Sequence, residues 1–256
     1  MAWNAATYLN FADHRTRPAY ELIARIPLDA PRLIYDLGCG PGNSTHALQE
    51  RWPQAKLIGV DNSREMLSAA RERGPNGVEW QEADIAGWSP PEAPDLIYSN
   101  ATFQWIAGQE RLLPRLLKTV QSGGALAFQI PANHTEPPHT IIDDVLKHQG
   151  LAHRIKSASL SRHVLPQTEY FRLLSPLASS LDIWDTRYLQ VLKGVDPVLN
   201  WIRGTALVPI VAELNERESH AFLDEMRSRL AEHYPQESNG DTLFPFSRRF
   251  IVARRG

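Results

Sequence analysis

Three glycines within five residues form the stretch of this sequence best suited to holding a ligand. Gly38, Gly40 and Gly42 follow the apolar run "RLIYDL" and precede a segment with helical spacing. Glycines at a strand-to-helix turn leave backbone N–H groups exposed and let a ligand approach without interference from Cβ atoms. The stretch therefore predicts a site at which the backbone contacts a bound ligand.

Two common ligands of such loops fit this one poorly. A phosphate-binding P-loop needs Gly-Lys-Ser/Thr after its glycines, and no lysine follows Gly42. A dinucleotide loop follows the pattern G-x-G-x-x-G, and after Gly38 and Gly40 the third glycine is replaced by Asn43.

An acidic residue at the end of the next apolar run indicates what kind of ligand the loop binds. Asp61 ends "KLIGVD" and follows Gly42 by 19 residues, the separation expected of a carboxylate that binds ribose hydroxyls. Such a carboxylate accepts a hydrogen bond from each hydroxyl of the cis-diol. Taken alone, Asp61 is better explained by a structural role, as a polar strand end or a helix cap. In combination with the glycine loop, ribose binding is the stronger interpretation.

The elements that position these residues follow from the alternation of short apolar runs with helical patterns. This alternation predicts βαβ units and a parallel sheet in the first half of the chain. The expected strands are 32–38, 56–61, 78–84, 95–100 and 124–131, and the expected helices begin near 18, 44, 64 and 110.

After Pro131 the rhythm changes. Residues 132–167 are polar and rich in His and Pro, with a helix expected only in the middle. Segments 181–192 and 248–255 are candidate strands that would form a late antiparallel hairpin. Between them, Asn215 and Glu218 make a plausible capping pair for a helix that ends before Pro235. The expected fold is α/β, with a parallel sheet, a late antiparallel strand and an inserted helical cap.

We expect one domain over 1–256, with a ligand-binding core at 31–130 and covering segments at 1–30, 131–178 and 194–243. The composition of the 256 residues is ordinary for a globular protein, with a net charge of −2. This charge argues against a protein that binds nucleic acid through a basic surface. A single cysteine, Cys39, excludes an internal disulfide. No apolar run approaches the length of a membrane span, and we expect a cytoplasmic monomer.

Four motifs in order now identify a family. "DLGCGPGNS", "GVDNSREML", "EADI" and "DLIYSNATFQW" span Asp36 to Trp105 and resemble the motif series of class I S-adenosylmethionine-dependent methyltransferases. The resemblance implies a Rossmann-like fold and S-adenosylmethionine as cofactor. It places the glycine loop beneath the methionine part and Asp61 at the ribose. The residues that it assigns to the cofactor in this stretch are Asp36, Gly38, Cys39, Gly40, Gly42, Asn43, Asp61, Asn62, Met66, Asp84, Ile85, Asn100 and Ala101.

Within this set, the resemblance implies that Met66 packs on the adenine and that Asp84 and Ile85 lie at its amino edge. Asn100 and Ala101 would offer backbone to the methionine end. Met66 taken singly fits a core position equally well, and Cys39 is a small loop residue, not a nucleophile.

The residues at the tip of the fourth strand indicate which class of methyl acceptor to expect. "SNATFQWI" lacks the Asn/Asp-Pro-Pro-aromatic motif of enzymes that methylate base or amide nitrogens, and together with the balanced charge this favours a small-molecule acceptor. "WNAATYLNFADHRTRPAYELIARIPL", "DIWDTRY", "WIRGTALVP" and "PFSRRFIVARR" extend the resemblance over nearly the whole chain to the trans-aconitate 2-methyltransferase family. That family esterifies one carboxylate of trans-aconitate. Two departures, "IPAN" at 130–133 and Val208 where members often have Arg, leave the exact acid open.

A polycarboxylate needs cationic and hydrogen-bonding side chains more than a general base, because its carboxylates are already ionised at neutral pH. We therefore expect no catalytic acid or base, and catalysis by proximity and alignment. "HTEPPHT" has two histidines but no convincing metal geometry, so no metal is expected. The wider set of candidate cationic groups is Arg15, Arg17, His134, His139, Arg162, His163, Arg203, Arg248 and Arg249.

From this set and its neighbours we select two groups. The resemblance favours Tyr8, Arg15, Arg17 and Arg203, and the position after the fourth strand favours Gln104 and Trp105. Tyr8 and Arg15, in a segment that folds over the cofactor in similar enzymes, are assigned to the cofactor. The residues assigned to the acceptor are Arg17, Gln104, Trp105, His134, Trp201 and Arg203. Either Arg15 or Arg17 could instead pair with the carboxylate of the cofactor, and Trp105 could equally be a core anchor.

Three rival functions stay open. A malonyl-thioester O-methyltransferase shares the cofactor half but would need a basic rim for a carrier protein. A nicotinamide-dependent dehydrogenase shares the glycine loop and Asp61, although Asn43 argues against it. A non-catalytic protein that senses the cofactor would bind it without turnover on any acid.

Overall fold

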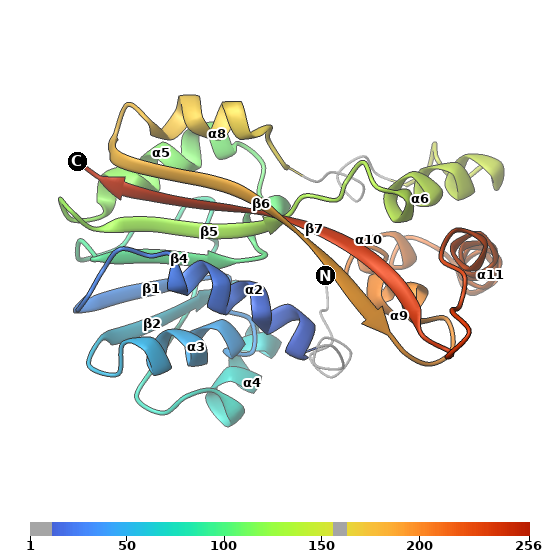
Figure 1. The fold of residues 1–256 in the computed structure, drawn as a ribbon, viewed down its shortest axis with the longest axis horizontal. Helices are drawn as coiled ribbons and strands as arrows, with labels where there is room; N and C mark the ends of the chain where they lie inside the picture. Colours follow the sequence, from blue (N-terminus) through green and yellow to red (C-terminus); the bar gives the residue numbers. More distant parts are fainter. Residues whose placement is uncertain (1–11, 156–162) are drawn as a thin grey trace. The chain divides into compact units, whose positions relative to one another are not determined.

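The computed structural model describes residues 12–155 and 163–256 and divides them into two compact units. The sheet unit comprises residues 12–131, 163–186 and 248–256, and the helical unit comprises 132–155 and 187–247. Figure 1 labels their helices and strands. The expected core, 31–130, lies wholly in the sheet unit. Residues 12–30 and 163–178, which we had assigned to covering segments, belong to the same unit.

A mixed sheet of seven strands is the centre of the sheet unit. The strand order is β3-β2-β1-β4-β5-β7-β6, and β3, β2, β1, β4 and β5 run parallel to one another. β7 pairs antiparallel with β5, from Ala125 opposite Arg254 to Pro131 opposite Arg248. The predicted α/β fold with a late antiparallel strand is confirmed. The strands are β1 (Leu33–Leu37), β2 (Lys56–Asp61), β3 (Glu79–Glu82), β4 (Leu96–Asn100), β5 (Ala125–Pro131), β6 (Ala178–Leu192) and β7 (Thr242–Arg255).

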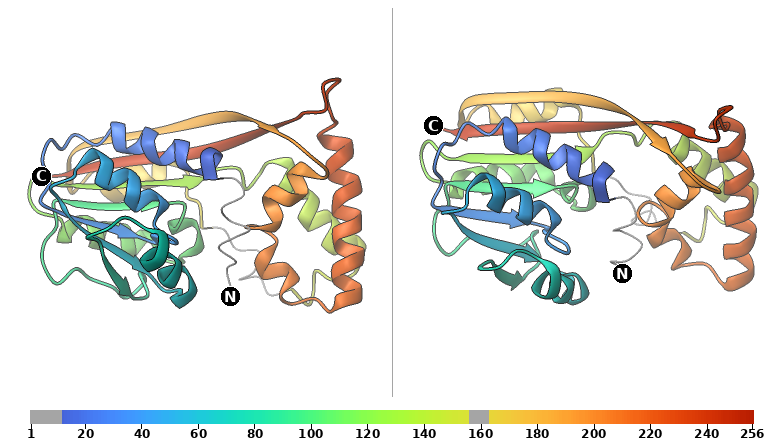
Figure 2. Two further views of the ribbon diagram at one scale, coloured as in Figure 1. Left: turned by 90° about the horizontal axis from the view of Figure 1, so that it is seen from below. Right: turned by 60° about the horizontal axis from the view of Figure 1, so that its bottom comes forward.

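Helices cover both faces of this sheet (Figure 2). α2, α3 and α4 lie on one face, and α5 and α8 lie on the other. The helices of the unit are α2 (Ala12–Ala24), α3 (Asn43–Arg51), α4 (Arg64–Arg73), α5 (Gln109–Thr119) and α8 (Gln167–Leu174), with the short 3-10 helix η1 (Phe103–Trp105) after β4. Because both faces are covered, every residue of β1 is buried, as expected of a central parallel strand.

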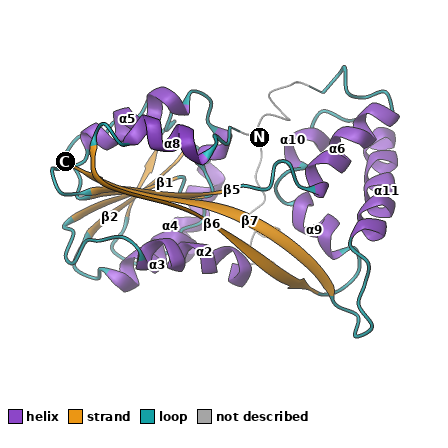
Figure 3. Cartoon of the chain, turned by 45° about the horizontal axis from the view of Figure 1, so that its top comes forward, coloured by secondary structure: helices purple, strands orange, loops and turns teal. Residues whose placement is uncertain are grey.

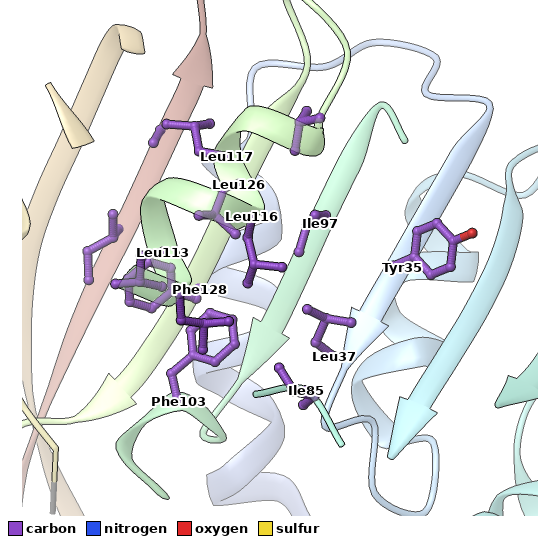
Figure 4. Close-up of a cluster of buried hydrophobic side chains, with 14 of the residues drawn as sticks. Tyr35, Leu37, Ile85, Ile97, Phe103, Leu113, Leu116, Leu117, Leu126 and Phe128 are labelled. Atoms are coloured by element: carbon purple, nitrogen blue, oxygen red, sulfur yellow. The ribbon is translucent and has the colours of Figure 1, made fainter. Parts of the chain in front are cut away.

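Figure 4 shows the core between the sheet and α5. Phe103 and Phe128 meet edge to face with ring centroids 5.1 Å apart, and Leu113 and Leu116 of α5 pack beside them. Leu37 of β1 and Ile97 of β4 belong to the same core. Apolar residues at helical spacing in α5 and at alternate positions in the strands therefore build one contiguous core. This core fixes the carboxyl ends of the strands.

The helical unit has a core of its own. It combines four helices with the outer parts of β6 and β7, which Figure 3 shows as long continuous strands. The helices are α6 (Pro137–His148), α9 (Pro197–Arg203), α10 (Val208–Val211) and α11 (Glu216–His233). The predicted capping pair is confirmed, because the Asn215 side chain accepts from the Glu218 N–H and the Glu218 side chain accepts from the Asn215 N–H.

Several elements differ from the sequence expectation. β6 begins at Ala178 and not at 181, and β7 begins at Thr242 and not at 248. The added part of β7 alternates, with Thr242, Phe244 and Phe246 buried, so it continues the strand inward-facing at every second residue. The helices α8, α9 and α10 were not expected; each is short and carries too few apolar positions for a helical period to stand out. Within residues 12–155 and 163–256, no helix is long and apolar enough to cross a membrane.

Candidate functional site

The glycine loop lies between β1 and α3 and is tied to the neighbouring strand. The N–H groups of Gly38 and Cys39 both donate to the Val60 carbonyl, at 2.7 and 3.2 Å. Gly38 has φ 73°, and a Cβ atom placed on it would lie 2.1 Å from Thr102 Oγ1. Gly38 is therefore required by the packing of the loop against the tip of β4, since a larger residue would force the two apart.

Gly40 is a glycine for a different reason. Its φ is 54°, and a Cβ atom placed on it would meet nothing within 4 Å. The space above Gly40 is open, so no neighbouring atom of the described chain excludes a side chain there, and only the positive φ favours glycine. The Gly40 N–H donates to Asp61 Oδ2 at 2.9 Å, which links the glycine loop to the end of β2. An open cradle of this kind fits a ligand that lies across the loop.

Asp36 of β1, before the glycine loop, is hydrogen-bonded to the first turn of α3, after the loop. Its carboxylate is 1% exposed, and Oδ2 accepts from Ser44 Oγ at 2.9 Å and from Thr45 Oγ1 at 2.7 Å. These hydroxyls lie in the first turn of α3, so the three side chains join the start of the loop to its end. Oδ1 has no hydrogen-bond partner within the described part of the chain. Burial raises the pKa of Asp36 to about 6, against the lowering effect of the two hydroxyl hydrogen bonds.

Asp61 is positioned to accept further hydrogen bonds. Its Oδ1 accepts from the Ser63 N–H at 2.8 Å, and its Oδ2 accepts from Gly40. Each carboxylate oxygen has a second lone pair, so both oxygens can also accept from a ligand hydroxyl. Burial raises the pKa of Asp61 above its ordinary value, while the N–H groups of Ser63 and Gly40 favour the charged form.

Four further motif residues follow β2 and β3 in the chain. Met66 is 5% exposed in α4, whose N-cap Ser63 accepts from the Met66 N–H at 3.3 Å. Asp84 and Asn62 are exposed, and Asp84 Oδ1 accepts from the Ala86 N–H at 3.0 Å. Ile85 is buried and belongs to the core on the α5 side. The polar members of this group are thus accessible to a ligand.

Cys39 is 3% exposed, and burial raises the pKa of its thiol well above the ordinary value. A buried neutral thiol is a poor nucleophile. Asn43 is half-buried as the first residue of α3, and Gly42, with φ 92°, precedes it as the helix cap.

The tip of β4 has an unusual backbone. Ala101 has φ 56°, a left-handed conformation that side chains rarely adopt, and its N–H donates to the Gln129 carbonyl at 2.9 Å. Strain of this kind gathers at ligand sites. Gln104 follows in η1, 5% exposed, and its Nε2 donates to the Ala101 carbonyl at 2.7 Å. Trp105 is half-buried.

A polar relay extends from this tip into β5 and β7. Gln129 Nε2 donates to Asn100 Oδ1, and Arg248 Nη1 donates to Gln129 Oε1 at 3.1 Å. Gln129 is fully buried and Arg248 is 4% exposed, while Asn100 is half-buried. Gln129 was not predicted as a site residue, although it is the only polar side chain in the expected strand "GALAFQIP". Ser44 and Thr45, which follow the glycine loop directly, and Thr102 were not predicted either.

The predicted acceptor residues fall into both units. The sheet unit contains Arg17, which is exposed on α2, and also Gln104 and Trp105 in η1. In the helical unit, His134 and Arg203 are exposed, whereas Trp201 is 3% exposed and packs against Phe244 and Phe246. Tyr8, the side chain of Arg15, and Arg162 lie outside the described residues.

Two further candidates have structural partners. Arg249 pairs with Asp185 at 2.8 Å and donates to the Leu165 carbonyl at 2.6 Å. His163 donates its N–H to the Gln104 carbonyl at 2.9 Å, which ties the segment before α8 to η1. Among residues 12–155 and 163–256, no cluster of three His, Cys, Asp or Glu side chains could hold a metal ion.

Comparison with known proteins identifies relatives over the whole chain. The family described as a methyltransferase domain matches residues 34–124. A protein of Rhodopseudomonas palustris (strain BisB5), named trans-aconitate 2-methyltransferase, is 44% identical over 252 residues, which are 98% of each chain. A protein of Methylobacterium nodulans with the same name is 44% identical over 254 residues, covering 99% of this chain and 98% of the relative.

Solved structures share the fold at low sequence identity. The YcgJ protein from Bacillus subtilis has a TM-score of 0.57 and 16% identity, covering 94% of this chain and 99% of that one. Phosphoethanolamine N-methyltransferase 2 of Haemonchus contortus, solved in complex with S-adenosyl-L-methionine, has a TM-score of 0.56 and 13% identity, covering 94% of this chain and 53% of that one.

Proposed function

Since this chain belongs to the trans-aconitate 2-methyltransferase family, we propose that it is an S-adenosylmethionine-dependent O-methyltransferase that esterifies one carboxylate of trans-aconitate to the monomethyl ester. The observation that carries the proposal is the edge of the sheet at β1 and β2. There, the open space over Gly40 lies next to a carboxylate, Asp61, whose two oxygens are already aligned by backbone N–H groups.

This chain offers the cofactor a set of contacts that suits its parts. The loop 38–42 supports the methionine part, and Asp61 accepts from the ribose hydroxyls. Met66 and Ile85 supply apolar surface for the adenine, and the exposed carboxylate of Asp84, the residue before Ile85, accepts from its amino group. We assign the remaining contacts to Asp36, Cys39, Gly42, Asn43, Asn62, Asn100, Ala101, Tyr8 and Arg15.

S-adenosylmethionine supplies an activated methyl group when it is bound. The residues of this chain then have to hold the acceptor carboxylate in line with that methyl group and keep water away. They need not remove a proton, because a carboxylic acid with an ordinary pKa near 4 is ionised at neutral pH. Proximity and alignment are therefore sufficient sources of rate acceleration, and we assign no side chain as a general base.

Binding the three carboxylates of the acceptor is the larger task. We assign it to Arg17, Gln104 and Trp105 in the sheet unit and to His134 and Arg203 in the helical unit. Arginine is suited to this role because its planar fork matches a carboxylate with two parallel hydrogen bonds. Trp201, buried against Phe244 and Phe246, would act through α9 by fixing the helix that ends at Arg203.

A small acid as acceptor and a single buried cysteine also fit a monomer in a reducing cytoplasm, and we include both in the proposal. Sedimentation at working concentration measures the oligomeric state.

The test of the acceptor is a comparison of kcat/KM for trans-aconitate, cis-aconitate, citrate, isocitrate and a malonyl thioester, with methyl-labelled S-adenosylmethionine as donor. We expect trans-aconitate to be fastest, with a base-labile monomethyl ester as the product. Preference for another free acid would keep the reaction and reject this substrate, and Val208 would be the first residue to examine. Preference for the malonyl thioester, or binding without turnover, would reject the proposed function.

A further inference from the structure

The relay from Arg248 through Gln129 to Asn100 determines which end of the Asn100 amide is free. Arg248 has N–H donors and no acceptor, so the Gln129 atom that it contacts at 3.1 Å must be the carbonyl oxygen Oε1. The Gln129 amide can then present only its NH2 group to Asn100. That group donates to Asn100 Oδ1, so Asn100 Nδ2 points away from the relay.

The O and N atoms of an amide side chain are difficult to tell apart by shape, but the contact with Arg248 distinguishes them in Gln129. The orientation follows from the chemistry of arginine and holds whatever other partners Arg248 has. Gln129 is fully buried between the two, so solvent does not compete for its hydrogen bonds. The polarity of Asn100 is therefore set from β7, two strands away from β4 in the sheet.

Asn100 lies at a position where the direction of its side-chain amide affects ligand binding. It ends β4, directly before the left-handed Ala101, and it is half-buried beside the glycine loop, since Thr102 packs over Gly38. Ligands of parallel α/β sheets bind at the carboxyl ends of the strands. Two N–H donors at this position suit a carboxylate oxygen, whereas a carbonyl oxygen would repel it.

We propose that Arg248 and Gln129 are positioning residues that hold the Asn100 side-chain amide with its Nδ2 toward the ligand, where it donates to a carboxylate oxygen. The inference rests on the proposed function, because the two ligands of that reaction both carry carboxylates. The carboxylate belongs either to the acceptor acid or to the methionine part of the cofactor, and the experiment separates the two.

The decisive variant is Gln129→Glu. A glutamate at this position keeps an acceptor for Arg248, and the buried charge is neutralised by the guanidinium. It has no donor, so Asn100 must turn its Nδ2 toward Glu and present Oδ1 to the ligand. The matched control is Gln54→Glu, which adds the same charge at an exposed position of the sheet unit.

Two quantities are measured for each variant: the KM for the acid, and the Kd for S-adenosylhomocysteine and for 5'-methylthioadenosine, which lacks the methionine carboxylate. We expect Gln129→Glu to weaken one carboxylate ligand by about tenfold or more, with kcat changed much less, and Gln54→Glu to match the wild type. A higher KM alone assigns the carboxylate to the acid. A higher Kd for S-adenosylhomocysteine, with the Kd for 5'-methylthioadenosine unchanged, assigns it to the cofactor.

Other results overturn the inference. They are a folded Gln129→Glu variant with both constants within about threefold of the wild type, or one that weakens 5'-methylthioadenosine as much as S-adenosylhomocysteine. If Gln129→Glu does not fold, Arg248→Lys and Arg248→Gln decide. Lysine is donor-only and should preserve ligand affinity, while glutamine can donate or accept and should reduce it; equal effects contradict the inference.

Failure of the proposed function is recognised separately. Wild-type protein that binds S-adenosylhomocysteine but methylates no acid rejects the function. The polarity of Asn100 is then decided by the S-adenosylhomocysteine and 5'-methylthioadenosine affinities alone, and an unchanged pair would overturn it.

Discussion

Substitutions at Gly40 and Gly77 separate two effects of an added side chain. One is the loss of space for a ligand, and the other is the loss of stability of the folded chain. Both glycines have a positive φ, 54° and 80°, and a Cβ atom on either would meet nothing within 4 Å. Changing either residue to Ala should cost about 1–2 kcal/mol of unfolding free energy, because a left-handed conformation is strained for any side chain. Only Gly40→Ala should also weaken cofactor binding, since its methyl group would occupy the open cradle.

Urea denaturation and calorimetric titration with S-adenosylhomocysteine measure both effects in the two variants. Equal affinities for the ligand in Gly40→Ala and Gly77→Ala would contradict the placement of the cofactor over the loop.

The buried carboxyl of Asp36 gives stability a particular pH dependence. Its pKa is about 6 in the folded protein and 3.8 when exposed, so between these values the folded state binds a proton that the unfolded state has lost. The unfolding free energy should therefore decrease as the pH rises from about 4 to about 6, by at most about 3 kcal/mol, and be flat above that for this group.

Asp36→Asn does not titrate and is the reference for this effect. The unfolding free energy of both proteins is measured by denaturation at several pH values between 4 and 7. As the pH rises, the value for the wild type should decrease relative to the value for Asp36→Asn. A difference that is constant with pH would show that Asp36 is ionised throughout that range.

Among the elements, the start of α11 offers a local test of the capping box. Asn215→Ala removes the side chain that accepts from the Glu218 N–H at 3.0 Å, and the loss of such a cap costs about 1 kcal/mol. His220→Ala, at an exposed position inside the same helix, is the control and should change stability much less. Chemical denaturation measures both, and equal effects would argue that the cap contributes nothing.

The elements also show what the sequence could predict. β1, β2, β4 and β5 are apolar runs bounded by turns, and their existence and parallel pairing were predicted correctly because a doubly covered parallel strand has no polar face. The short helices α8, α9 and α10 were missed, since their positions depend on tertiary packing that leaves too few residues for a period.

Site residues divide in a similar way. The contact between Gly40 and Asp61 joins segments that two motifs had already marked, so it could be expected. The Arg248 and Gln129 relay could not, because β7 lies more than a hundred residues beyond β5 in the chain, and nothing local indicates that they pair.

At the scale of the whole molecule, cofactor binding is expected to affect one of the two compact units and not the other. All described residues that we assign to the cofactor belong to the sheet unit. S-adenosylhomocysteine should therefore slow amide hydrogen exchange at the carboxyl ends of β1, β2 and β4 and raise stability by about 2.7 kcal/mol at a hundredfold excess over Kd. The amides of α11, in the helical unit, should exchange at an unchanged rate. Protection confined to α11 would place the cofactor elsewhere.

The central claim is that this protein transfers a methyl group to a carboxylate oxygen of trans-aconitate. The most direct measurement is incubation with methyl-labelled S-adenosylmethionine and trans-aconitate, followed by mass analysis before and after mild base. We predict one labelled methyl group per acid, lost on treatment with base, together with one S-adenosylhomocysteine per ester formed. No labelled acid, or a label that resists base, would contradict the claim.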